Sequence, residues 1–262
     1  MKLGFVQWPE GLSANGPAWE AIAASVKRAA PDILVTNEMP FGPWIARLSA
    51  YDEKIAGGSV AAHEEGLAAL QALPVPLIIS SRPVWCEDRL ANECFALCGG
   101  AYQFLHQKHF FPAEGGWFET SWYRTGKKGF ELAKYEVPGG TIQVGALICT
   151  ELMFNEHARA YGKAGAELIV APRASGRNPA SWRTAAAMAA LVSGCYVVSS
   201  NRVGPSDGGP VFGGTGFAYG PDTTPLGQTS VEEPLALVEI DPARSRKQKS
   251  EYPCYVTEDA TP

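Results

Sequence analysis

Three side chains with the chemistry of a catalytic group each follow a predicted strand. They are Glu38, Lys108 and Cys149. A thiol is a nucleophile, a carboxylate can take its proton, and an ammonium group can stabilise negative charge on a substrate oxygen. Sites in α/β folds gather at the carboxyl ends of strands. We therefore expect the three strands to pack side by side, with all three ends on one rim.

The segment 141–159 places the thiol where a strand gives way to a helix. Before the thiol, residues at a spacing of two share one face of a strand: Ile142, Val144, Ala146 and Ile148. After the thiol, residues at helical spacing indicate a helix: Phe154, His157, Ala158 and Tyr161. A thiol on such a turn is held rigidly and can point into a cleft. A buried core cysteine is the ordinary alternative. The backbone N–H of Thr150 is a candidate second donor to a substrate oxyanion.

The elements that must position these residues predict an α/β fold. Strands are expected at 3–7, 32–37 and 75–81 and helices at 17–30 and about 52–73, which gives the order β-α-β-α-β. Two hairpins follow, 92–97 with 102–107 and 130–137 with 141–148, separated by a long loop at 108–129. Further strands are expected at 167–171, 195–201, 216–219 and 235–241, and a helix at 180–193. No change in composition marks a linker, so we expect one domain over 1–262, with a C-terminal arm from about 242–262.

Composition and charge narrow the class of protein. The 262 residues are 46% hydrophobic and 19% charged, with a net charge of −5, so a large core is expected and nucleic acid is not an expected partner. No apolar run is long enough to cross a membrane, and the N-terminus does not read as a signal peptide. The six cysteines include no CxxC pair and are expected to be reduced thiols in a cytoplasmic protein. No cofactor or metal is expected, because the four histidines show no metal-type pairing with cysteine.

Three blocks of sequence resemble the nitrilase superfamily of carbon–nitrogen hydrolases. They are TNEMPFG around Glu38, HQKHFFPAEGGW around Lys108 and VGALICTELMFNEHAR around Cys149. The resemblance extends from VQWP at 6–9 to about Tyr255. It implies a four-layer αββα sandwich and a covalent mechanism. Cys149 would attack the substrate carbon, Lys108 would stabilise the oxyanion, and Glu38 would transfer protons before water hydrolyses the thioester. It also implies a homodimer or a higher homo-oligomer.

The resemblance further implies a second catalytic glutamate in the loop after Lys108. Glu114 in PAEGGW matches this motif best, and Glu119 is the competing candidate. Substrate contacts are expected from Trp117 and Thr150, with Phe118 and Trp182 as further pocket walls. Arg173, which follows the strand at 167–171, is a candidate ligand for a substrate carboxylate; a surface or interface ion pair is its alternative.

The residues after the thiol help to distinguish an amide substrate from a nitrile. Nitrilases of the family typically have Trp and then Glu after the cysteine, whereas this chain has Thr150 and then Glu151. We therefore favour hydrolysis of a small amide or N-carbamoyl compound. Nitrile hydrolysis or acyl transfer on the same scaffold, and a non-catalytic binding protein, remain the alternatives. A nucleotide-binding loop at 208–216 is disfavoured, because no helix and no GK[ST] motif follow it.

Overall fold

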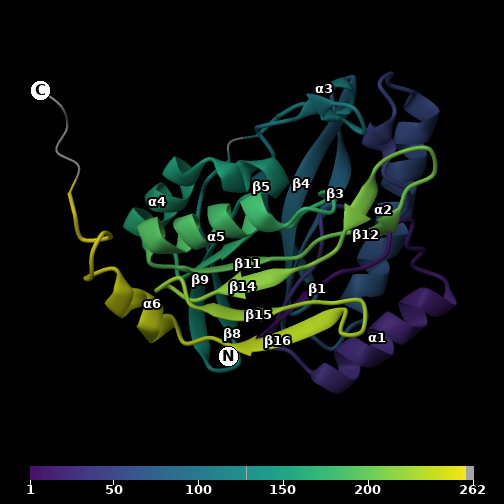
Figure 1. The fold of residues 1–262 in the computed structure, drawn as a ribbon. Coiled ribbons are helices and arrows are strands. Elements are labelled where there is room, and N and C mark those ends of the chain that lie inside the picture. The colour runs from purple at the N-terminus through teal and green to yellow at the C-terminus, as the bar shows by residue number, and fades with distance from the viewer. Residues whose placement is uncertain (128, 258–262) are drawn as a thin grey trace, which may run out of the picture.

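Two six-stranded sheets pack face to face and carry helices on their outer faces in the computed structural model, which describes residues 1–127 and 129–257 (Figure 1). The four layers confirm the expected αββα sandwich.

The first sheet has the strand order β16-β1-β2-β3-β4-β5. Its strands are β16 (Leu235–Glu239), β1 (Lys2–Val6), β2 (Ile33–Val35), β3 (Leu77–Cys86), β4 (Arg89–Cys98) and β5 (Ala101–Gln107). The strands β1, β2 and β3 are parallel, and the other neighbours are antiparallel. Helices α1 (Pro17–Ala29) and α2 (Glu53–Gln71) cover the outer face of this sheet.

The second sheet has the order β15-β14-β11-β10-β9-β8. Its strands are β15 (Pro225–Gln228), β14 (Phe217–Tyr219), β11 (Tyr196–Ser199), β10 (Leu168–Val170), β9 (Gly140–Ala146) and β8 (Ala133–Val137). Here β9, β10 and β11 form the parallel centre. Helices α4 (Asn155–Ala164) and α5 (Ala180–Ser193) lie side by side on the outer face.

The sequence of the central strands explains the layers. Strand residues alternate between the two faces of a sheet, so an all-apolar strand can bury both. In β2, Ile33 and Val35 face the other sheet, whereas Leu34 packs with the apolar residues of α1 and α2. Burying one such side chain stabilises the fold by about 1.5–3 kcal/mol. The core between the sheets therefore fixes which strand ends meet at the site.

Most predicted elements are confirmed, but β3 extends to Cys86 instead of ending at residue 81, and three further segments differ. The strand expected from residue 130 begins at Ala133. The segment 108–127 contains a small hairpin, β6 (Ala113–Glu114) with β7 (Trp117–Phe118), and a helix, α3 (Glu119–Trp122), where an unstructured loop was expected. The glycine-rich loop contains β12 (Val203–Pro205) and β13 (Val211–Gly213).

The expected side-by-side packing of the three strands that precede Glu38, Lys108 and Cys149 is wrong. In the first sheet, β3 and β4 separate β2, which precedes Glu38, from β5, which precedes Lys108. Strand β9, which precedes Cys149, belongs to the second sheet. The three side chains nevertheless meet, because the two sheets stack and the ends of these strands lie at the same edge of the sandwich.

The remaining segments lie at the edges of the sandwich. Helix α6 (Pro242–Gln248) follows β16 and begins the segment expected to form an arm; of that arm, residues 258–262 lie outside the described part of the chain. Two short 3₁₀ turns, η1 (Ile45–Arg47) and η2 (Cys149–Met153), lie near the site. Among the helices that the structure describes, none has the length and apolar character needed to span a bilayer.

Candidate active site

The turn after β2 holds Glu38 rigidly. The Glu38 N–H donates to Arg173 O at 3.2 Å, and Arg202 Nε donates to Glu38 O at 3.1 Å. The next residue, Met39, has a φ of 42°, and its N–H donates to Ser81 Oγ at 2.9 Å. A non-glycine residue in the left-handed region costs roughly 1–3 kcal/mol and persists only where surrounding bonds fix it. Here those bonds aim the carboxylate of Glu38 into the site.

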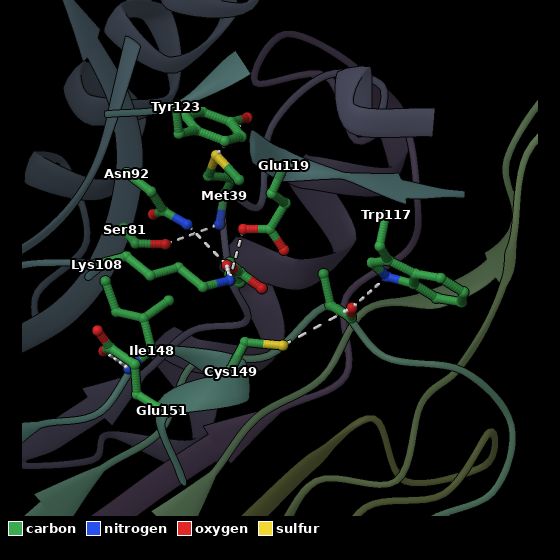
Figure 2. A network of polar contacts seen from close by, with 12 residues as sticks. Met39, Ser81, Asn92, Lys108, Trp117, Glu119, Tyr123, Ile148, Cys149 and Glu151 are labelled. Atoms are coloured by element: carbon green, nitrogen blue, oxygen red, sulfur yellow. Dashed lines mark hydrogen bonds and ion pairs between the residues drawn. The ribbon is translucent and has the colours of Figure 1, made fainter. Parts of the chain in front are cut away.

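Lys108 lies between two carboxylates. Its Nζ is 2.9 Å from Glu38 Oε1 and 2.7 Å from Glu119 Oε2, and all three side chains are fully buried. Figure 2 shows the ammonium group of Lys108 pointing toward Glu119 and toward the thiol of Cys149. Asn92 Nδ2 also donates to Glu38 Oε1, at 2.7 Å. One oxygen of Glu38 is thus occupied twice.

The other oxygen of each carboxylate has no protein partner. Within residues 1–127 and 129–257, Glu38 Oε2 and Glu119 Oε1 are buried and accept no hydrogen bond. An unpaired buried oxygen on a carboxylate is costly and calls for an explanation. Glu38 Oε2 is thus available to accept a proton, whereas Oε1 is held by Lys108 and Asn92.

Cys149 lies on a strained turn between β9 and η2. Its φ is 49°, its N–H donates to Pro172 O at 2.9 Å, and its Sγ is 3.9 Å from Ala174 O. The side chain is 3% exposed and borders a cavity, so it is accessible to a small molecule only through that cavity. The turn has the geometry of a nucleophile elbow, in which strain presents the reactive atom.

The charges at the site favour a neutral thiol in the resting state. Burial, and next the charge of Glu38, raises the pKa of the Cys149 thiol, and Lys108 offsets this only in part. Burial alone would lower the pKa of Lys108, but the charges of Glu119 and Glu38 raise it well above its usual value. A thiol in this state could act as a nucleophile only if a base took its proton.

Glu119 is the group in this cluster that holds a proton at neutral pH. Burial raises its pKa to about 8 against the opposing charge of Lys108, and the charge of Glu38 adds to the increase. Two carboxylates that share one cation in a dry site cannot both ionise without cost. A protonated Glu119 leaves Lys108 and Glu38 as the charged pair.

Glu151 ties together the backbone next to two of these residues. Its Oε2 accepts from Ile148 N at 2.8 Å, just before Cys149, and its Oε1 accepts from His109 N at 2.6 Å, just after Lys108. His106 Nε2 lies 2.8 Å from Oε2. Because Phe130 N donates to His106 Nδ1, the Nε2 atom carries the hydrogen and donates to Glu151. The buried carboxylate thus links the ends of β5 and β9 across the two sheets.

A cavity of about 150 Å³ opens above the thiol. As expected for substrate contacts, Trp117 and Thr150 line this cavity. Trp182 lines it as well, whereas Phe118 does not. Its lining is Pro112, Glu114, Trp117, Cys149, Thr150, Ala174, Ser175, Gly176 and Trp182. Trp117 Nε1 donates to Ala174 O at 2.9 Å, which fixes the indole as one wall. Thr150 is in the first turn of η2, where N–H groups have no partner within the helix.

The structure places Glu119, and not Glu114, on Lys108. Glu114 is exposed on β6 at the cavity, and of the two it is Glu119 that pairs with the ammonium group. The expectation that Glu114 holds Lys108 is therefore corrected in favour of the competing candidate. A sequence signal existed: Glu119 lies between the aromatic residues Phe118 and Trp122, and a carboxylate that such residues bury needs a cation or a proton.

Arg173 does not line the cavity, so the expectation of a carboxylate ligand is not met. Its guanidinium is fully buried and donates to Ser199 Oγ at 2.6 Å, to Ser175 Oγ at 2.7 Å and to Thr215 O at 2.9 Å. It packs against the rings of Trp182 and Phe217. Burial lowers the pKa of Arg173 to about 10. The residue supports the cavity wall from behind.

One described group has the composition of a metal site. Ligand atoms of His106, His109 and Glu151 all lie within 4.8 Å of one another. These atoms already serve hydrogen bonds: His109 Nδ1 lies 2.6 Å from Gln107 O, and both Glu151 oxygens accept from donors. The hydrogen bonds account for the closeness of the three side chains.

Comparisons with known proteins agree with this geometry. Residues 4–250 match the carbon–nitrogen hydrolase family. An N-carbamoylputrescine amidase of Arabidopsis thaliana is 26% identical over 162 residues, which is 55% of this chain and 53% of that protein. An (R)-stereoselective amidase of Pseudomonas sp is 30% identical over 113 residues, 42% of this chain and 41% of that protein. The chain thus spans about half the length of the curated relatives it matches.

Solved structures share the fold over nearly the whole chain. A carbon–nitrogen hydrolase from Helicobacter pylori G27 has a TM-score of 0.82 at 21% identity and covers 97% of this chain and 94% of its own. An amidase from Nesterenkonia sp. has a TM-score of 0.75 at 22% identity, with 96% and 94% covered. At this level of identity the likeness concerns the fold.

Proposed function

Because the chain belongs to the carbon–nitrogen hydrolase family of the nitrilase superfamily, we propose that it hydrolyses a non-peptide carbon–nitrogen bond in a small amide or N-carbamoyl compound. One observation carries the proposal. The thiol of Cys149 borders a small cavity, and behind it Lys108 is held between Glu38 and Glu119. Nucleophile, base and oxyanion-stabilising cation are thus assembled in one dry site.

The first half of the reaction forms a thioester. Cys149 Sγ attacks the carbonyl carbon while its proton passes to Glu38 Oε2, the oxygen without a protein partner. Negative charge develops on the substrate oxygen, where Lys108 Nζ and the N–H of Thr150 stabilise it. The carbon–nitrogen bond then breaks, and the nitrogen takes the proton from Glu38 and leaves as ammonia or an amine.

The second half regenerates the enzyme. Glu38 removes a proton from water, the hydroxide adds to the thioester carbon, and the carbon–sulfur bond breaks. The thiolate of Cys149 recovers the proton from Glu38, and the acid product leaves. Glu119 holds Lys108 in place and, with its pKa raised to about 8, does so without neutralising the charge that the oxyanion needs.

Two features favour an amide over a nitrile. Thr150 follows the nucleophile where nitrilases of the family typically have Trp. The curated relatives named above are amidases. The small cavity suits a short acyl or carbamoyl group next to Cys149.

A panel of small amides, monosubstituted ureas and nitriles of matched length tests the proposal. The amides or ureas should release ammonia or amine with the native chain and not with Cys149→Ala. Turnover of nitriles alone would contradict the amide assignment. Transfer to added hydroxylamine in preference to water would favour acyl transfer. Turnover by Cys149→Ala would remove Cys149 from the mechanism.

We also propose that the chain forms a homodimer through η2, α4 and α5. Large apolar side chains on η2 and α5, and at the residue just before α4, are 36–44% exposed: Met153, Met188, Leu191 and Phe154. The resemblance to the nitrilase superfamily implies a homodimer or a higher homo-oligomer, and in that family dimers commonly form through helices near the cysteine. Light scattering of the native chain should give a dimer mass, and Met188→Glu should shift it toward the monomer. A monomer mass for the native chain at micromolar concentration would contradict the proposal.

A further inference from the structure

The cavity above Cys149 contains one charged group at its wall. Of the described residues that line it, only Glu114 carries a formal charge at neutral pH; the others are apolar, aromatic or neutral polar residues and the thiol itself. A substrate group that reaches this wall therefore lies next to a carboxylate, which favours a positive charge on that group.

Neither Arg173 nor Lys108 is available to a substrate anion. Arg173 is buried behind the wall, with its three donor atoms bonded to Ser199, Ser175 and Thr215. Lys108 is buried between Glu38 and Glu119. A substrate carboxylate in the cavity would thus meet Glu114 and no unpaired cation among the lining residues, and like charges placed together cost affinity.

Glu114 is free to bind a cation. No described side chain forms an ion pair or a hydrogen bond with its carboxylate, and the ammonium group of Lys108 is paired with Glu38 and Glu119 instead. The β6–β7 hairpin fixes its position, because Glu114 pairs in register with Trp117. Trp117 is itself anchored through Nε1 to Ala174 O.

Two indole rings line the cavity together with this carboxylate. Trp117 and Trp182 are both half-buried wall residues. Aromatic rings next to a carboxylate favour an alkylammonium group, because the alkyl chain packs on the rings and the cation is attracted to both the ring faces and the carboxylate. A neutral alkyl chain gains only the first of these contacts.

We propose that the substrate carries a protonated amine at the end remote from the scissile bond, and that Glu114 selects for it. The substrate class is then an aminoalkyl amide or an N-carbamoyl diamine. The inference rests on the proposed reaction at Cys149, which fixes the other end of the substrate. It names Glu114 as a specificity residue and leaves proton transfer to Glu38.

Three amides of equal length isolate the charge: 5-aminopentanamide is cationic, hexanamide is neutral and the monoamide of adipic acid is anionic. The native chain should show a kcat/KM for the cation about fivefold above that for the neutral amide, the size expected of one partly exposed ion pair. Glu114→Gln should bring this ratio to about one, and Glu114→Lys should favour the anion. High salt should reduce the native ratio. Glu20→Gln, an exposed change on α1, is the matched control and should leave the ratio unaltered.

Binding to Cys149→Ala separates this inference from the proposed reaction. Calorimetry should give tighter binding of 5-aminopentanamide than of hexanamide in the Cys149→Ala background, and no difference once Glu114→Gln is added. If the native chain hydrolyses none of the amides yet this difference is present, the charge preference stands and the reaction is wrong. If the amides are hydrolysed with equal kcat/KM and bound equally, or if Glu114→Gln leaves the ratio unchanged, the inference is overturned and the reaction stands.

Discussion

Lys108 Nζ lies 2.7 Å from Glu119 Oε2, closer than its 2.9 Å distance to Glu38 Oε1. The ammonium group is thus shared by two buried carboxylates that enter the site from different elements. Because Glu119 begins α3 and Glu38 follows β2, the pairing joins the segment after Lys108 to the first sheet. Burial raises the pKa of Glu119 to about 8, so the cluster holds one proton beyond the ion pair at neutral pH.

Glu119→Gln should flatten the dependence of stability on pH. The pKa of Glu119 rises from 4.5 to about 8 on folding, so its contribution is fully present below 4.5 and is lost as pH rises through 8. Between pH 4.5 and 8, the free energy of unfolding of the native chain should fall by up to about 1.4 kcal/mol per pH unit relative to that of the variant. Urea unfolding at several pH values between 5 and 9 measures both slopes. Parallel curves would show that Glu119 ionises normally.

Lys108→Met should destabilise the protein by about 3–5 kcal/mol, because it leaves the charge of Glu38 buried without a cation. Adding Glu38→Gln removes that charge and should restore much of the free energy of unfolding. Both variants should lack activity, since each removes a group that the proposed mechanism requires. Unfolding by urea, compared with ammonia release, separates the two effects. A Lys108→Met variant that is as stable as the native chain would contradict the buried ion pair.

Glu151→Gln should lower kcat while leaving KM nearly constant. Both carboxylate oxygens accept from donors, so an amide NH₂ would face a backbone N–H of Ile148 or His109. This mismatch should cost about 1–3 kcal/mol of stability and shift Lys108 relative to Cys149. Steady-state kinetics and urea unfolding check both. Glu156→Gln, an exposed neighbour on α4, should change stability by less than about 0.5 kcal/mol. Equal effects of the two variants would show that Glu151 does not position the site.

Local sequence was sufficient to predict the strands and the three residues that follow them. An apolar run such as 32–37 indicates a strand that is buried on both faces, and a reactive residue at its end indicates a candidate site. It does not report which strand lies beside it, so the split of β2, β5 and β9 between two sheets could not be predicted. Sheet membership depends on contacts between segments far apart in the chain.

The errors concern residues whose partners are distant in sequence. The predictions for Glu119 and Arg173 used only the residues next to them in the chain. In the structure, Glu119 is buried against Lys108, and Arg173 is buried against Ser199. The β6–β7 hairpin could have been predicted, because a Gly-Gly pair such as Gly115-Gly116, between Glu114 and Trp117, is a sequence signal for a two-residue hairpin turn. That hairpin brings Glu114 to the cavity and Glu119 to Lys108.

The most direct test is the intact mass of the protein during turnover of a small amide. Rapid acid quenching should reveal a species heavier by the acyl group, and peptide mapping should place the adduct on Cys149 and on none of the other five cysteines. The adduct should decay as free acid forms and should be absent from Cys149→Ala. Turnover without any acylated species, or an adduct that maps to another cysteine while Cys149→Ala remains active, would contradict the account.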